Sequence, residues 1–170
     1  SCVTIFASSE VRQATGNFAA ANRIGGGGFG HVYLCQPLQG SGSSALLAVK
    51  RLEAGVGEAG QGHREFHKEL QVLGTSSHPN VLPLIGFSAV DEEMCLVFPL
   101  MSGGSLEDRL VRDTDAMRRL RLVSGGDIPG ALSSRQRVDI LVGVARAIIY
   151  LHTPNARSHK KETIHRDIKP

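Results

Sequence analysis

A run of glycines placed directly before an apolar stretch constrains this chain more than any other feature of its sequence. Gly25, Gly27 and Gly30 satisfy the spacing G-x-G-x-x-G, and residues 31–35 (HVYLC) have the composition of a strand. A dinucleotide-binding fold would instead continue from such a loop into a helix. We therefore predict a glycine-rich hairpin tip, whose backbone N–H groups can approach phosphate oxygens closely because Cβ atoms are missing. A plain hairpin turn is the alternative, but it explains neither the length of the run nor Phe29 at its tip.

The composition places the chain among soluble globular proteins of about one domain. It has 170 residues, 41% hydrophobic and 21% charged, close to the average for such domains. The net charge of +3 is too balanced to require a nucleic-acid partner. No apolar run approaches the roughly 20 residues of a membrane span, and the N-terminus lacks the pattern of a secretory signal. The chain begins without Met and ends inside a motif, so we expect it to be part of a longer protein.

The cysteines favour an intracellular location. Cys2, Cys35 and Cys95 are far apart in the sequence and form no C-x-x-C pair, which excludes a zinc ribbon or a dithiol redox motif. A sparse, odd number of cysteines fits reduced thiols in the cytoplasm. His63 and His67 are four residues apart, but they do not form H-E-x-x-H and no third ligand is evident, so we predict no metal site there.

The order of the predicted elements indicates an α+β fold. Strands and helices occur in separate groups, unlike the alternating βαβ order of a doubly wound sheet. Apolar runs and periodicity predict strands at residues 31–35, 45–51, 81–87 and 94–98, and helices at 5–14, at 63–74, after Ser105, and from Ser133 or Ser134 to 152. Residues 113–130 form a charged, glycine-bearing segment next to several arginines, which we interpret as a solvated surface insertion.

A lysine at the end of the second apolar strand requires an anionic partner. Lys50 follows Ala48 and Val49, and a cation that finishes a buried strand is costly unless it is paired. Two anions are available: a phosphate under the glycine loop and a carboxylate on the next helix. Glu69 is the better candidate on that helix, and Glu65, four residues earlier, is the alternative. A lysine exposed at a strand end is the remaining interpretation.

Four motifs together resemble those of eukaryotic protein kinases. They are Ile24-Gly25-x-Gly27-x-Phe29-Gly30-x-Val32-Tyr33, Ala48-Val49-Lys50, Glu69, and His165-Arg166-Asp167-Ile168-Lys169-Pro170. The resemblance runs from about Asn22 to the last residue. Finer features are similar to the Pelle, interleukin-1-receptor-associated and plant receptor-like kinase group: Ala14-Thr15-x-Asn17-Phe18, His78-Pro79-Asn80-Val81, Leu84-Ile85-Gly86-Phe87, Gly104-Ser105-Leu106 and Tyr150-Leu151-His152.

The resemblance implies a kinase-like α+β fold in two lobes. An antiparallel five-stranded sheet with one helix, αC, would form the N-lobe, followed by the first helices of an incomplete helical C-lobe. The expected divisions are an N-terminal extension with a short helix at residues 1–21, the N-lobe with the hinge at its end at 22–101, and the start of the C-lobe at 102–170. Leu73, Leu84 and His165 would stack as part of a hydrophobic spine between the lobes, and the apolar face of 140–151 would be exposed.

The resemblance also implies an ATP site. The ATP phosphates would be covered by Gly25, Gly26, Gly27, Gly28, Phe29 and Gly30, and the adenine would be clamped by Ile24, Val32 and Ala48. Lys50 would hold the α- and β-phosphates and be locked by Glu69. The gatekeeper would be Phe98, the hinge would be Pro99, Leu100 and Met101, and the ribose would be reached by Ser105 or Asp108.

The last motif implies protein serine/threonine kinase activity. Asp167 would accept the proton of a substrate hydroxyl, Lys169 would steady the γ-phosphate, and Arg166 would pair with a phosphorylated activation loop. In this family, Mg²⁺ is held by an Asn, expected two residues after Pro170, and by the D-F-G motif. The 170-residue sequence contains neither, so we expect the fragment to be inactive alone. The partners would be ATP and a protein with Ser or Thr, in the cytoplasm, on the intracellular side of the membrane for a receptor-like parent. The alternative is a pseudokinase-like scaffold or an ATP-binding module without catalysis.

Overall fold

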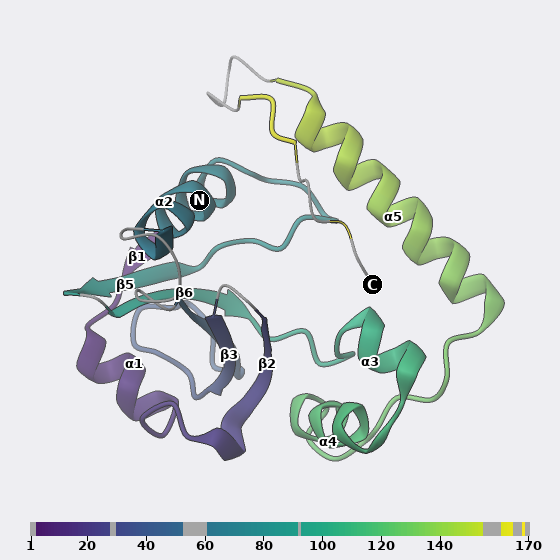
Figure 1. The fold of residues 1–170 in the computed structure, drawn as a ribbon, viewed down its shortest axis with the longest axis horizontal. Coiled ribbons are helices and arrows are strands. Elements are labelled where there is room, and N and C mark those ends of the chain that lie inside the picture. The colour runs from purple at the N-terminus through teal and green to yellow at the C-terminus, as the bar shows by residue number, and fades with distance from the viewer. Residues whose placement is uncertain are drawn as a thin grey trace.

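One six-stranded sheet carries the glycine run on its edge (Figure 1). The computed structural model describes residues 3–27, 30–52, 61–91, 93–154, 161–164 and 168. The strand order is β1-β5-β6-β4-β3-β2. The strands are β1 (Thr4–Ile5), β2 (Arg23–Gly27), β3 (Gly30–Cys35), β4 (Leu47–Leu52), β5 (Gly86–Val90) and β6 (Glu93–Pro99).

The helices lie on both sides of this sheet and beyond its last strand. In Figure 1, α1 and α2 lie on opposite sides of the sheet, and α3, α4 and α5 follow on from β6. Their bounds are α1 (Ser8–Ala14), the 3-10 helix η1 (Ala20–Asn22), α2 (Gln61–Gly74), α3 (Leu106–Val111), α4 (Thr114–Val123) and α5 (Ser134–His152). Within the described ranges, none of these helices combines the length and the apolar character that crossing a membrane requires.

The core is divided by the sheet into two apolar clusters. Strand β4 shows why, because alternate residues of a strand point to opposite faces. Leu47 and Val49 pack on the α1 side with Val11, whereas Ala48 and Leu52 pack on the α2 side with Phe66. Strand β6 is covered on both faces, and all residues from Met94 to Phe98 are buried. One cluster lies between α1 and the sheet and the other between the sheet and α2, so this part of the molecule has three layers: helix, sheet and helix.

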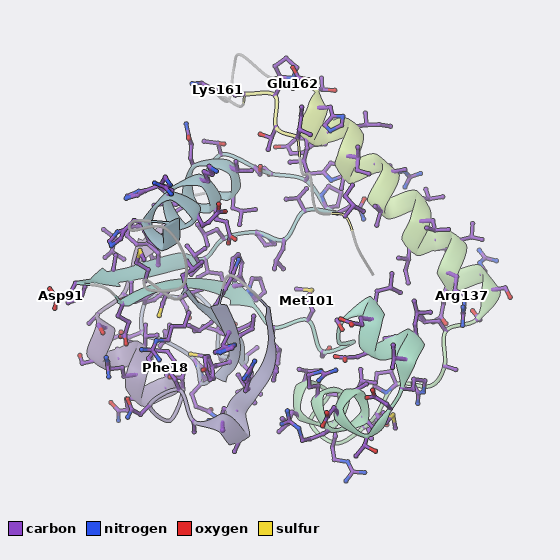
Figure 2. The ribbon with its side chains drawn as sticks, viewed as in Figure 1. Phe18, Asp91, Met101, Arg137, Lys161 and Glu162 are labelled. Carbon is purple, nitrogen blue, oxygen red and sulfur yellow. The ribbon has the colours of Figure 1, made fainter. Side chains whose placement is uncertain are left out.

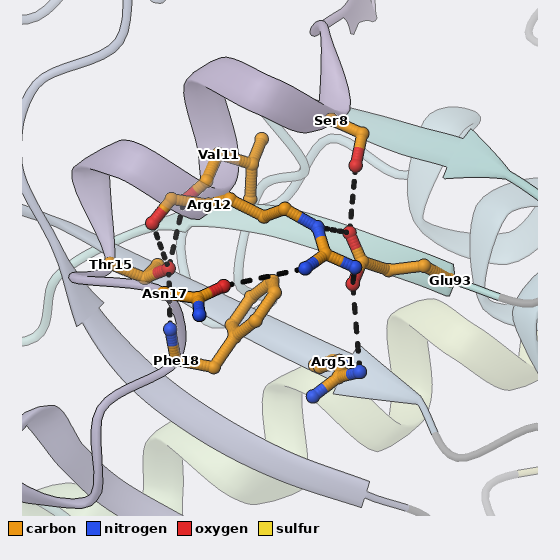
Figure 3. Close-up of polar contacts among 8 residues, drawn as sticks. All are labelled: Ser8, Val11, Arg12, Thr15, Asn17, Phe18, Arg51 and Glu93. Carbon is orange, nitrogen blue, oxygen red and sulfur yellow. Dashed lines mark hydrogen bonds and ion pairs between the residues drawn. The ribbon is translucent and has the colours of Figure 1, made fainter.

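A polar network fixes α1 to the sheet (Figure 3). The carboxylate of Glu93 accepts a hydrogen bond from Ser8 Oγ at 2.7 Å and two from Arg12, at 3.0 Å from Nε and 2.6 Å from Nη2. Arg51 Nη2 lies 3.5 Å from the same carboxylate, and its guanidinium lies 4.5 Å from the ring centre of Phe18. One acidic residue on β6 thus holds a serine and an arginine of α1 and an arginine of β4.

The sheet differs from the predicted antiparallel five-stranded one. It is mixed and has six strands, because β1 pairs in parallel with β5, with Thr4 opposite Gly86. A Cβ atom on Gly86 would lie 2.2 Å from the carbonyl oxygen of Thr4, so β1 can approach only because position 86 is glycine. The strand predicted at 81–87 is also wrong in its bounds. Pro83 lacks an N–H for a strand ladder, and β5 starts at Gly86.

The segment interpreted as a solvated insertion contains a helix. Helix α4 buries Ala116, Leu120 and Val123 along one face, a spacing of i, i+4 and i+7 that the surrounding arginines obscure in the sequence. The predicted helix near residue 134 is confirmed: Ser133 caps α5, and its hydroxyl oxygen accepts a hydrogen bond from the Gln136 backbone N–H at 3.2 Å. The interpretation of this segment as solvated surface was therefore wrong for α4, because one narrow apolar stripe is enough to pack the helix.

We expect Gly86→Ala to destabilise the protein by about 1–3 kcal/mol, because the added methyl group forces β1 away from β5. Urea unfolding followed by circular dichroism measures this change. Gly130→Ala is the matched control, since a Cβ atom at position 130 would have no heavy atom within 4 Å, and it should stay within about 0.5 kcal/mol of the wild type. Equal stability of the two variants would contradict the close pairing of β1 with β5.

We expect the thiols of Cys35 and Cys95 to resist alkylation in the native protein. Burial raises the pKa of each to about 12, so both stay protonated near pH 8, and only the thiolate is nucleophilic. Mass spectrometry of peptides after iodoacetamide treatment separates these thiols from Cys2. Modification of Cys35 or Cys95 as fast in buffer as in urea would show that the sheet is not closed around them.

Candidate functional site

The centre of the site is an ion pair between β4 and α2. Lys50 Nζ donates a hydrogen bond to Glu69 Oε1. The two side chains are 24% and 28% exposed, so both charges have lost most of their contact with water and stabilise each other. Glu65, the alternative partner, instead lies 3.6 Å from Lys68 Nζ on the same helix.

Aromatic packing brings Glu69 to this position. Phe66 lies one helical turn before Glu69 and is 3% exposed. Its ring meets Phe87 of β5 edge to face, with 5.8 Å between the ring centres. Leu70 and Leu73 pack against the same apolar cluster. Because these residues hold one side of α2 on the sheet, the neighbouring Glu69 faces β4.

The register of the sheet gathers the predicted nucleotide residues on the face that α2 covers. Lys50 lies opposite Val32 on β3, and Ala48 lies opposite Phe98 on β6. Residues directly opposite each other share a face, as do residues two apart on one strand. Gly25 lies opposite Val32 in turn. One face of the sheet therefore presents a cation, apolar surface and a glycine strand side by side.

The glycine hairpin is described up to its tip. Gly26 lies opposite His31, and Gly27 lies opposite Gly30. Gly30 has a φ of 134°, and a Cβ atom there would lie 2.2 Å from the carbonyl oxygen of Arg51, so no other residue fits. A Cβ atom on Gly27 would have no heavy atom within 4 Å, which leaves open space beside the backbone. Ile24 stands at the β-bulge between Arg23 and Gly25 and is half-buried.

The predicted hinge connects β6 to α3. Phe98 is 6% exposed and belongs to the cluster beneath α2. Pro99 ends β6 and is half-buried. Met101 follows in the connecting segment (Figure 2). This residue is 52% exposed. The backbone at the end of β6 thus lies between the sheet and the helices that follow.

The two candidates for a ribose contact have different surroundings. Ser105 caps α3, and its hydroxyl oxygen accepts a hydrogen bond from the Asp108 N–H at 3.0 Å. The Asp108 side chain is 6% exposed and accepts a hydrogen bond from Arg119 Nε of α4 at 2.9 Å, which raises the pKa of Arg119. Sequence reasoning missed this partner because α4 was not predicted. Arg119 thus engages one oxygen of the Asp108 carboxylate, Oδ1, and the Ser105 hydroxyl caps α3. A ribose contact by Ser105 or Asp108 stays a prediction.

Several predicted residues lie outside the described residues. They are Gly28, Phe29, His165, Arg166, Asp167 and Lys169. Of the proposed spine, Leu84 is buried and Leu73 packs against the same cluster. His63 and His67 are exposed on α2. Across the part of the chain that the structure describes, no group of three or more His, Cys, Asp or Glu side chains could hold a metal ion.

Sequence reasoning also missed the contact that positions α5. The Tyr150 ring stacks on His78, with 4.9 Å between ring centres and 20° between planes. Its hydroxyl oxygen accepts a hydrogen bond from the Ser77 N–H at 2.8 Å. His78 and Tyr150 are both motif positions in the sequence, but their spacing along the chain gives no sign of a contact. Through Tyr150, the C-terminal end of α5 is fixed to the loop after α2.

Comparison with known proteins shows which family the sequence resembles. The sequence profile of the family described as protein tyrosine and serine/threonine kinase matches residues 18–169. The rice leucine-rich repeat receptor protein kinase MSL1 is 40% identical over 161 residues, 94% of this chain and 10% of the relative. The Arabidopsis thaliana probable serine/threonine-protein kinase PBL20 is 36% identical over 170 residues, 97% of this chain and 38% of the relative. The Caenorhabditis elegans Pelle-like serine/threonine-protein kinase pik-1 is 38% identical over 164 residues, 94% of this chain and 30% of the relative.

The match covers most of this chain but only a small part of each relative. The chain spans between 10% and 38% of the lengths of these three relatives. The profile, by contrast, covers all of the described sheet except β1, together with the helices from α2 to α5. The fold, the profile match and these relatives agree: the chain belongs to the protein kinase family.

Proposed function

We propose that this chain carries the ATP-binding part of a protein serine/threonine kinase. The observation that supports this most is the ion pair between Lys50 and Glu69 on the sheet face beside the glycine strand. Relatives named as serine/threonine-protein kinases support the choice of Ser and Thr over Tyr as the phosphate acceptor. So does Lys169, two residues after Asp167, in the sequence.

In this proposal, the chain's own residues bind and orient the nucleotide. Glu69 holds the Lys50 ammonium group in place for the α- and β-phosphates, so little reorganisation is needed when ATP binds. Val32 and Ala48 form an apolar surface for the adenine, and Ile24 closes it from the strand edge. The carbonyl oxygen of Pro99 accepts from the adenine amine, and the N–H of Met101 donates to the ring.

The proposed chemical step is transfer of the γ-phosphoryl group. The substrate hydroxyl oxygen bonds to the γ-phosphorus, the bond from this phosphorus to the β–γ bridging oxygen breaks, and ADP leaves. Asp167 accepts the hydroxyl proton, and Lys169 neutralises charge on the transferring group. Mg²⁺, when bound with ATP, would neutralise charge on the phosphates. Among the described residues, no group of three or more His, Cys, Asp or Glu side chains could hold a metal ion, so we assign none of them to this ion.

We also propose the placement of this unit in a larger protein. Residues 22–101 would form the N-lobe with the hinge at its end, residues 102–170 would begin the C-lobe, and residues 1–21 would extend the N-lobe. A protein with Ser or Thr side chains and ATP would be its partners, and nucleic acid would not. The receptor kinases among the relatives favour a cytoplasmic location, on the intracellular side of a membrane.

We expect Lys50→Met to weaken ATP binding at least tenfold, because a charged hydrogen bond to phosphate contributes roughly 1.5–3 kcal/mol. Isothermal titration of the chain with ATP measures the change in Kd. Lys68→Met is the matched control, since Lys68 lies on α2 with a side chain 70% exposed, and it should bind ATP as the wild type does. Equal affinities for Lys50→Met and Lys68→Met would argue against Lys50 as a phosphate ligand.

We expect a polypeptide of residues 1–170 to bind ATP without transferring phosphate, because its sequence contains no D-F-G motif. Incorporation of labelled phosphate into a general protein substrate, with Mg²⁺ and ATP, measures turnover. The Lys50→Met variant sets the background. Incorporation above that background would overturn the prediction, and absence of ATP binding would favour the pseudokinase-like scaffold.

A further inference from the structure

Helix α4 reaches across from the helical region to the edge strand of the sheet. Arg118 Nη2 donates a hydrogen bond to the carbonyl oxygen of Arg23 at 3.3 Å, between residues 95 apart in sequence. Helix α4 packs beside β2 as well as against α3. Arg23 is the first residue of β2, two residues before Gly25, where the glycine run begins. The contact therefore lies where the glycine hairpin leaves the rest of the sheet.

Helix α4 is anchored firmly at its other side. Its apolar face is buried, with Ala116 and Leu120 both 0% exposed. A Cβ atom on Gly104, in the segment before α3, would lie 2.4 Å from Leu120 Cδ2, so glycine there allows close packing. The ion pair of half-buried Arg119 with buried Asp108 links α4 to α3. The Asp113 carboxylate caps the helix by accepting a hydrogen bond from the Ala116 N–H at 2.8 Å.

Strand β2, in contrast, has little support of its own. It is the edge strand, hydrogen-bonded only to β3 in the sheet, and a bulge interrupts the pairing between Arg23 and Gly25. Its last three residues, 25–27, are glycines, which lose the most conformational entropy on ordering. The hydrogen bond from Arg118, on the anchored helix α4, to the start of this strand limits how far the hairpin can move.

We propose that α4 braces the glycine hairpin and that Arg118 is a positioning residue that acts through the backbone of β2. The brace joins the sheet to the segment after the hinge by a route separate from the hinge itself. Its consequence for nucleotide affinity rests on the function proposed above, whereas its effect on β2 does not. Arg118 touches no nucleotide in this proposal; it restricts the strand whose glycines would cover the phosphates.

Hydrogen exchange without nucleotide tests the brace directly. Arg118→Ala should speed exchange of the amides in residues 24–27 by about three- to tenfold, the range expected for loss of one exposed hydrogen bond. Arg118→Lys keeps a donor and should restore part of the protection. Arg121→Ala, on an exposed arginine of the same helix, should leave exchange unchanged. Unchanged exchange in Arg118→Ala, or an equal effect of Arg121→Ala, would overturn the proposal.

A second measurement separates this proposal from the proposed function. Titration with ATP should give Arg118→Ala a Kd about threefold to tenfold above that of Arg121→Ala, at an unchanged melting temperature. If neither variant nor the wild type binds ATP while exchange in residues 24–27 still responds to Arg118, the proposed function fails and the brace stands. If ATP binds equally to both variants and exchange is also equal, the brace fails and the proposed function stands.

Discussion

The contact between Lys50 and Glu69 depends on the register of the whole sheet. Lys50 lies opposite Val32 on one side and Leu96 on the other, and successive side chains of a strand point to opposite faces. A slip of β4 by one residue would turn Lys50 toward the α1 side and place Val49 at the site. Buried apolar residues of β4 prevent this, because Leu47 and Val49 are held in one cluster and Leu52 in the other. The packing of the core thus selects which side chain meets Glu69.

The two faces of the sheet are held by different kinds of interaction. On the α2 face, the described residues form an apolar cluster beside the ion pair, and Phe66 against Phe87 sets the position of the helix. On the α1 face, a polar network around Glu93 adds to the buried apolar residues. Charged hydrogen bonds are directional and shorter than neutral ones, so they orient α1. Apolar packing on the other face leaves the ion pair as the only charged contact between β4 and α2 among the described residues.

Sequence patterns predicted much of this arrangement, and the failures share a cause. The glycine run, the strand with Lys50 and the helix with Glu69 follow from local composition and periodicity. Strand β1 has two residues and pairs in parallel with a distant strand, so no local pattern marks it. Helix α4 was missed because arginines alternate with its three buried apolar residues and mask their spacing. The partner of Asp108, Arg119, was missed with it. The stack of Tyr150 on His78 is a contact between distant segments. What spacing along the chain cannot reveal is which separate segments meet.

The N-terminal segment has a consequence for where this structural unit begins. The family profile starts at residue 18, yet Phe6 and Val11 are 4% and 0% exposed in the core, and Ser8 and Arg12 bind Glu93. A chain cut at the start of the profile would leave an apolar surface over Val49, Val97 and Cys95 facing water, and exposed surface of that kind promotes self-association. The segment that the family profile covers is therefore shorter than the segment that packs into the core of this sheet.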